Sequence, residues 1–158
     1  MILTLLLLFQ SAQFLVGDGV VKNKTLRIEI LKNNQKFQTI VMEYYTEDKF
    51  SKTTDVVWGD FNFDGQTDVA LSDGNQGSYG AKSYEIYVFN ITKQQFVLSK
   101  ELSEIAHNSA GMFEYFPKTK TIKTYDKENA HTMRYQTYKV VFGKGLKLIN
   151  EKMVRSKN

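Results

Sequence analysis

The chain contains 158 residues, of which 42% are hydrophobic and 24% charged, values that fit one globular domain with a sizeable core. The formal net charge of +4 is mild, and the Lys and Arg residues are scattered. Nucleic-acid binding usually needs a basic stripe and a reading motif, so a nucleic-acid partner is excluded. The absence of cysteine excludes disulfides and leaves the N-terminus to indicate the compartment.

The first 17 residues, Met1–Gly17, contain no charged side chain. Their apolar centre, Ile2–Phe9, has the length of a signal-peptide core and is too short to span a bilayer. We predict that residues 1–17 form a cleavable signal peptide. The mature protein, 18–158, is then a single periplasmic or secreted domain without a membrane span. The alternatives are an uncleaved anchor and a buried first strand.

Alternation of apolar and polar residues dominates the chain after residue 17 and predicts β-strands. The strands Leu26–Leu31 and Phe37–Tyr45 are separated by Asn33-Asn34, which is typical of a hairpin turn. The next short strands, Val56–Trp58 and Val69–Leu71, flank an Asp-rich loop. Two further strands are expected at 84–89 and 95–99.

The segment Lys100–Asn108 is the best candidate for a helix, because Leu102, Ile105 and Ala106 form one apolar stripe. Two more hairpins are predicted, one pairing 112–116 with 121–125 and the other pairing 133–142 with 146–154. The fold class is therefore all-β with one short helix, arranged as an antiparallel β-sandwich or barrel.

The segment Asp60–Asp68 has the spacing of a calcium loop. Counted from Asp60, oxygen-bearing side chains occupy positions 1, 3, 5 and 9, and Gly65 occupies position 6, where a sharp turn is needed. The flanking segments indicate strands, so this is not a helix–loop–helix site. The alternative is a polar turn whose side chains bond their own backbone. The predicted Ca²⁺ ligands are the side chains of Asp60, Asn62, Asp64 and Asp68 and the backbone carbonyl of Gln66.

The segment Ser72–Gly80 follows directly and is polar and rich in glycine. Loops on a rigid base often carry binding residues. We expect Tyr79 to anchor a protein partner, with Asn75 and Ser78 donating or accepting hydrogen bonds. The alternative is a glycine-rich connection between strands that binds nothing.

Nothing in the sequence indicates an enzyme. The only two histidines are His107 and His131, and neither belongs to a recognisable nucleophile motif. Glu101 and Glu104 share one face of the predicted helix, where paired carboxylates of a hydrolase are one interpretation and a solvated helix face is the simpler one.

Three stretches carry a resemblance to a known family: GDFNFDGQTDVAL at 59–71, GNQGSYGAKSYEIYVFN at 74–90 and FVLSKELSEIAHNSAGMFEY at 96–115. They resemble bacterial periplasmic proteins that include immunity proteins against peptidoglycan-degrading effectors of type IV secretion. The resemblance implies a β-sandwich related to periplasmic lysozyme inhibitors. It also implies one calcium loop on Asp60, Asn62, Asp64 and Asp68, and a loop around Ser78 and Tyr79 that plugs a hydrolase cleft.

The chain departs from this family at Lys127–Met133, where many relatives carry a Cys pair and a Trp that are absent here. The +4 charge also favours a neutral or acidic hydrolase, because like charges slow encounter with a basic one. The sequence therefore predicts an exported calcium-binding inhibitor of a peptidoglycan hydrolase, in an immunity or lysozyme-inhibitor role. The alternative is a non-inhibitory, calcium-stabilised envelope or surface binding module.

Overall fold

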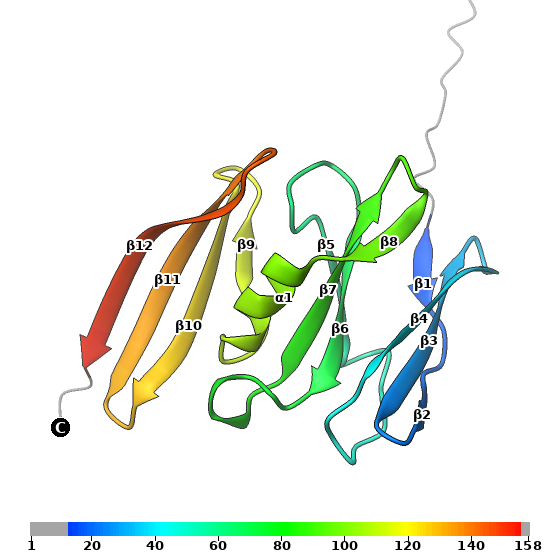
Figure 1. The fold of residues 1–158 in the computed structure, drawn as a ribbon, viewed down its shortest axis with the longest axis horizontal. Helices are drawn as coiled ribbons and strands as arrows, with labels where there is room; N and C mark the ends of the chain where they lie inside the picture. The colour runs from blue at the N-terminus through cyan, green and yellow to red at the C-terminus, as the bar shows by residue number, and fades with distance from the viewer. Residues whose placement is uncertain (1–12, 156–158) are drawn as a thin grey trace, which may run out of the picture.

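The computed structural model describes residues 13–155, and its strands form three antiparallel sheets of four strands each. Figure 1 shows the sheets side by side, with α1 beside the central one. Sheet A contains β1 (Phe14–Val16), β2 (Val20–Lys22), β3 (Thr25–Lys32) and β4 (Gln35–Glu43). Sheet B contains β5 (Val56–Gly59), β6 (Asp68–Gly74), β7 (Ser83–Asn90) and β8 (Gln95–Leu98). Sheet C contains β9 (Glu114–Phe116), β10 (Thr121–Asn129), β11 (Thr132–Val141) and β12 (Gly145–Arg155).

Sheet A is built on β3, which pairs with β4 along one edge and with β1 and then β2 along the other. The β3–β4 hairpin turns at Asn33 and Asn34, whose φ values of 52° and 64° are those of a tight hairpin turn that asparagine tolerates. The predicted leader, 1–17, lies mostly outside the described residues, but Phe14–Val16 at its end form β1.

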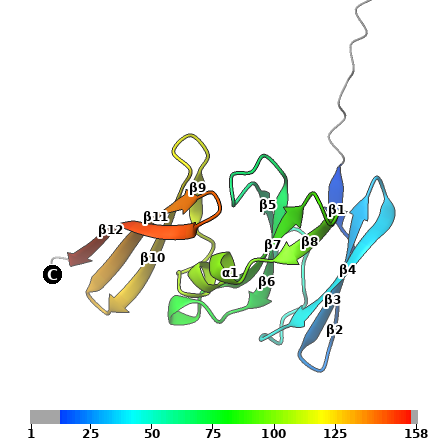
Figure 2. The same ribbon diagram turned by 45° about the horizontal axis from the view of Figure 1, so that its top comes forward.

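Sheet B is the central layer, and this position explains why β7 is apolar on both faces. Tyr87 and Phe89 pack against sheet A, whereas Tyr84 and Ile86 face α1 and sheet C. The predicted alternation within 84–89 is therefore confirmed. Figure 2 shows the same order of layers after a turn of the molecule.

Helix α1 (Lys100–His107) continues from β8 and runs along the first half of β7. Ser99 caps the helix, since its hydroxyl accepts a hydrogen bond from the Leu102 N–H. The pairing of β8 with β7 begins at Tyr87 and leaves the Ile86 N–H without a strand partner. This N–H donates a hydrogen bond to Ser103 Oγ of the helix at 2.8 Å, so the helix supplies the acceptor. Leu102, Ile105 and Ala106 are all buried, which confirms the predicted apolar stripe.

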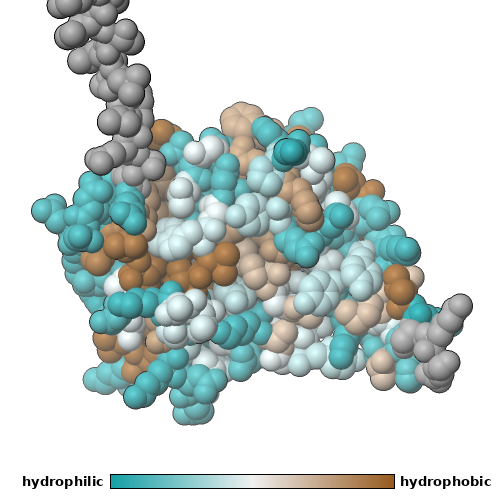
Figure 3. All heavy atoms as spheres, turned by 180° about the vertical axis from the view of Figure 1, so that it is seen from behind, coloured by the Kyte–Doolittle hydropathy of each residue, from teal (hydrophilic) through white to brown (hydrophobic). Residues whose placement is uncertain are grey.

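Some apolar side chains stay on the surface of sheet A and of sheet C, such as Val41 and Ile149. On the face drawn in Figure 3, the hydrophobic residues gather on the half that bears sheets A and B. On the outer face of sheet A, Val20 and Val41 are 64% and 56% exposed and lie on either side of Arg27. Within residues 13–155, no helix has the length and apolar character needed to cross a membrane.

The predicted fold class is confirmed, because the protein is mostly antiparallel strand with one helix and is sandwich-like. The described residues form no closed barrel, so that alternative is wrong. A buried first strand was only the alternative for residues 1–17, and β1 at Phe14–Val16, with Val16 buried, fits that alternative. The sequence did not indicate β2, or that the layers number three.

Candidate functional site

The Asp60–Asp68 loop connects β5 to β6 and curls around its own polar side chains. The two carboxylate oxygens of Asp60 accept hydrogen bonds from the N–H groups of Asp64 at 3.0 Å and Gly65 at 2.9 Å. The Asp64 N–H also donates to Asn62 Oδ1 at 3.1 Å. The oxygens of Asp60 and Asn62 therefore lie on the inner side of one tight turn.

Aromatic packing fixes the loop onto the core. Phe61 is fully buried, with its ring edge-on to Phe113 and Tyr115 at centroid distances of 5.7 and 5.2 Å. Phe63 is partly buried in the same cluster. Gly65 has a φ of 85°, a conformation that a residue with a Cβ adopts only with strain. Phe61 and Phe63 therefore pack the loop onto the core.

Asp68 ends the loop and is fully buried where β6 begins. Its carboxylate accepts hydrogen bonds from the N–H groups of Phe61 at 2.8 Å and Phe89 at 2.9 Å. Burial raises the pKa of Asp68 to about 7, although these backbone hydrogen bonds lower it. A cation held beside this carboxylate would offset the cost of burying its negative charge.

The donor set fits calcium in its chemistry, because the side chains are hard oxygen ligands arranged on one curled loop. The Gln66 N–H donates to Asp64 Oδ1 at 2.8 Å, and Asn62 Nδ2 donates to Asp64 Oδ2 at 2.9 Å. These bonds are also those of a polar turn, the alternative considered above. Calcium binding therefore stays a prediction for Asp60, Asn62, Asp64, Gln66 and Asp68.

The second predicted segment, Ser72–Gly80, is only partly a loop. Ser72, Asp73 and Gly74 continue β6 and are buried, so the expectation of a loop there is wrong. Polar residues hid this extension, since β-strand patterns are usually sought in apolar residues. The exposed connection begins at Asn75 and includes a turn of 3₁₀-helix at Ser78–Gly80.

This connection presents Tyr79 on a backbone held from several sides. Tyr79 is 65% exposed, and its φ of 56° is unusual for a residue with a side chain. The Ser78 N–H donates to the Ser109 carbonyl at 3.0 Å. A Cβ on Gly77 would lie 2.9 Å from the carbonyl oxygens of Ala81 and Ser109, so this position requires glycine. Tyr79 is thus presented on a firm base.

The two predicted sites lie at opposite ends of β6. The Asp60–Asp68 loop leads into its first residue, and the Asn75–Gly80 connection follows its last residue, Gly74. A strand of this length spans about 20 Å. An ion in the first loop therefore has no direct contact with Tyr79.

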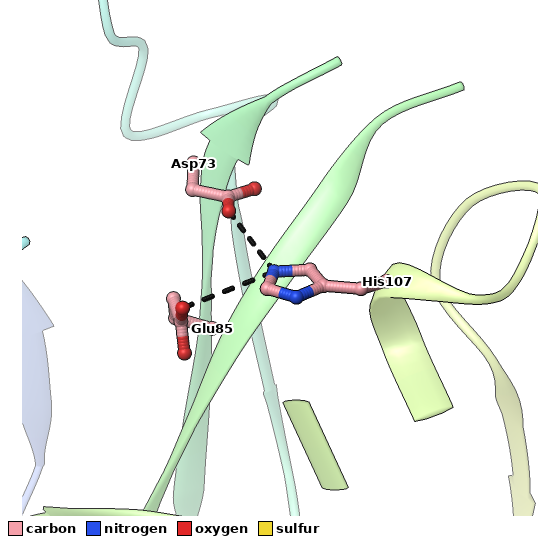
Figure 4. Close-up of side chains that lie close together, drawn as sticks. All are labelled: Asp73, Glu85 and His107. Atoms are coloured by element: carbon pink, nitrogen blue, oxygen red, sulfur yellow. Dashed lines mark hydrogen bonds and ion pairs between the residues drawn. The ribbon is translucent and has the colours of Figure 1, made fainter. Parts of the chain in front are cut away.

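Sequence reasoning missed a cluster formed by Asp73, Glu85 and His107. His107 Nε2 lies 3.0 Å from Asp73 Oδ2 and 3.9 Å from Glu85 Oε1. Figure 4 shows the two carboxylates, from neighbouring strands, turned toward the imidazole at the end of α1. Within residues 13–155, these form the one group of three His, Asp or Glu residues whose ligand atoms all lie within 4.8 Å of one another.

A β-bulge places Asp73 in this cluster. Ser72 pairs with Tyr84 and Gly74 with Ser83, so Asp73 is an extra residue whose side chain the bulge redirects. Asp73 accepts a hydrogen bond from Ser83 Oγ. Its hydrogen bond with the His107 imidazole is the largest cause of the raised pKa of His107. Asp73 and His107 are 34 positions apart in the sequence, so no local spacing signals their contact.

Glu101, one of the two helix carboxylates considered for catalysis along with Glu104, ties α1 to sheet C. Its Oε1 accepts a hydrogen bond from the Leu146 N–H at 2.8 Å. The residue is exposed, and this contact gives it a structural role.

Comparison with known proteins supports the fold. No protein-family model matches the sequence, and none of the curated proteins matches it. A solved structure of a Xanthomonas type IV secretion system related protein is similar, with a TM-score of 0.61 and 16% identity over 91% of this chain and 88% of that one. At this identity the similarity shows a shared fold alone.

Proposed function

We propose that this protein is an exported, calcium-stabilised inhibitor of a peptidoglycan hydrolase, in which the Asn75–Gly80 connection enters the enzyme's cleft. The observation that carries the proposal is Tyr79, a 65% exposed aromatic residue on a backbone fixed by hydrogen bonds. Aromatic side chains on firm supports are typical binding anchors. The role is that of an immunity protein or lysozyme inhibitor in the periplasm.

The fold adds support, because the similar Xanthomonas protein is related to a type IV secretion system. That description concerns the Xanthomonas protein, and its extension to this chain is part of the proposal. The basic charge of +4 favours a neutral or acidic hydrolase as the partner.

The surroundings of Tyr79 suit insertion into a cleft lined by polar groups. Lys127 Nζ lies 5.2 Å from the centre of the Tyr79 ring, and the Lys127 N–H donates to Ser78 Oγ at 3.4 Å. Asn75 is exposed at the start of the same connection. The tip thus combines one aromatic ring, one cation and several hydrogen-bonding groups.

Replacing Tyr79 with Ala should weaken inhibition. Loss of a central aromatic anchor typically costs about 2 kcal/mol or more, which is at least roughly 30-fold in the inhibition constant. The measurement is a titration of peptidoglycan hydrolysis with wild-type protein and with Tyr79→Ala. Phe142→Ala is the matched control, because Phe142 is an exposed aromatic residue that lies in the turn between β11 and β12, away from the contacts of Tyr79. Equal inhibition by wild type and Tyr79→Ala would remove Tyr79 from the interface.

Calcium in this proposal stabilises the fold. The side chains of Asp60, Asn62, Asp64 and Asp68, with the carbonyl of Gln66, would hold the ion. We expect calcium at tenfold above its Kd to add about 1.4 kcal/mol to the free energy of unfolding. Asp64→Ala should abolish this gain, whereas Glu47→Ala, at an exposed position outside the loop, should retain it. Unfolding with and without calcium tests this, and an unchanged gain in Asp64→Ala would contradict it.

A second candidate function is a calcium-stabilised surface module that binds an envelope component without inhibiting a hydrolase. The exposed Val20 and Val41 on the outer face of sheet A favour it, since exposed apolar groups often mark contact surfaces. Binding that survives Tyr79→Ala but is lost in Val20→Asp would support this alternative.

A further inference from the structure

We propose that Asp73, Glu85 and His107 form a binding site for a divalent transition-metal ion of the Zn²⁺ class, separate from the predicted calcium loop. The three side chains come from β6, β7 and α1 and converge on one point (Figure 4). Their donor atoms are one imidazole nitrogen and two carboxylate oxygens. This mixed set suits Zn²⁺ and its neighbours better than Ca²⁺, which prefers oxygen alone.

The distances between donor atoms fit such an ion. Zn–N and Zn–O bonds of about 2.0–2.2 Å at tetrahedral angles separate the donor atoms by about 3.4 Å. The two separations from His107 Nε2, 3.0 Å to Asp73 Oδ2 and 3.9 Å to Glu85 Oε1, lie on either side of this value. The third separation, between the carboxylate oxygens of Asp73 and Glu85, is also within 4.8 Å, and Glu85 is only partly buried.

The surroundings support the ligands as they do in metal sites. Asp73 is only 2% exposed, and Ser83 Oγ donates to its second oxygen, which fixes the carboxylate. Two of the three ligands, Glu85 and His107, also line an open surface pocket of ≈ 470 Å³ together with Glu104, which leaves room for a water or another ligand beside the ion. Lys100 also lines this pocket, and its positive charge disfavours a cation there. The negative charge of Glu104, in the same lining, offsets the charge of Lys100. Three protein ligands with one open position form a recognised class of zinc site.

The site lies at the base of the Asn75–Gly80 connection. Ser83 Oγ, which bonds Asp73, also accepts a hydrogen bond from the Gln76 N–H at 3.0 Å. A bound ion would therefore join α1 to the strand ends from which Tyr79 is presented. This is a contact that the calcium loop cannot make from the other end of β6. The inference rests on the ligand geometry and does not depend on hydrolase inhibition.

The test is a titration of the full chain, stripped by chelator, with ZnCl₂ in the presence of saturating calcium. We expect one Zn²⁺ per chain and an affinity at least tenfold lower in Glu85→Gln and in His107→Gln. His131→Gln is the matched control and should bind as wild type does. The Co²⁺ form should show the visible absorption of a four-coordinate ion.

Two results would overturn the proposal: no Zn²⁺ bound by wild type, or unchanged affinity in Glu85→Gln. Glu85→Gln still tests the proposal if His107→Gln fails to fold, because Glu85→Gln leaves the 3.0 Å contact between His107 and Asp73 intact. Circular dichroism of each variant verifies its fold before the titration.

Discussion

Replacing Phe61 with Ala should lower the free energy of unfolding by about 3–5 kcal/mol, the range found when a buried aromatic residue is truncated. Phe61 is fully buried and packs edge-on against Phe113 and Tyr115. It joins the core between sheet B and sheet C, to which α1 also contributes. Its removal should therefore open a cavity where three elements meet.

Phe142→Ala is the control for this prediction, because Phe142 is 97% exposed and its truncation should change stability by about 0.5 kcal/mol or less. Urea unfolding of both variants gives the comparison. Phe61→Ala should also weaken the response to calcium, because Phe61 holds the loop that carries the predicted ligands. Equal stability of the two variants would show that the loop is not anchored by Phe61.

The second large effect concerns β1. The free energy of unfolding of a chain that begins at Asp18 should be lower by about 3–6 kcal/mol than that of a chain that begins at Gln13. This difference is a large share of the stability of a typical domain. Phe14 packs against Phe37, Phe89 and Phe96 at centroid distances of 5.4, 5.4 and 5.0 Å. Val16 is buried in the same core, and both residues lie on a strand that covers an edge of β3.

Denaturant unfolding of the two chains measures this difference directly. Phe14→Ala in the longer chain should reproduce part of the loss, whereas Leu15→Ala should have a smaller effect because Leu15 points outward and is exposed. Equal unfolding midpoints for the two chains would contradict the role given to β1. If the predicted leader is cleaved, we expect the cut to fall before Phe14.

Local patterns predicted most of the strands and the helix. The Asn33-Asn34 pair marked a hairpin whose φ values are those of the expected turn, because asparagine tolerates this conformation better than most residues. The apolar stripe of α1 was equally clear, since Leu102, Ile105 and Ala106 recur with the helical period. These elements depend on neighbours in the sequence, which a pattern can reveal.

Features that depend on distant residues were missed. Strand β1 lies at the end of an apolar stretch whose composition also suits a leader, so a buried strand there was only an alternative, and its pairing with β3 could not be inferred. The contact of Asp73 with His107 requires a bulge in β6 and a helix that runs along β7. Neither follows from a period of two or of 3.6 residues. The Asp60–Asp68 motif was visible because all its predicted ligands fall in one short segment.

The predicted calcium loop and the proposed binding connection lie at opposite ends of β6, so we expect the first to affect stability and the second to affect binding. The predicted calcium loop precedes β6, and Tyr79 follows it, with Asp68–Gly74 between them. Calcium should therefore act on inhibition through the stability of the whole fold. The Asp73–Glu85–His107 cluster is joined to the Asn75–Gly80 connection through Ser83 Oγ, which bonds both Asp73 and the Gln76 N–H.

The most direct test is a titration of a secreted peptidoglycan hydrolase from the same organism with this protein, in calcium and in chelator, well below the unfolding temperature. The account predicts that hydrolysis falls to near zero once the protein is in excess, and that the inhibition constant changes little when calcium is removed. Full hydrolase activity at excess protein, across the organism's secreted peptidoglycan hydrolases, would contradict the proposed function.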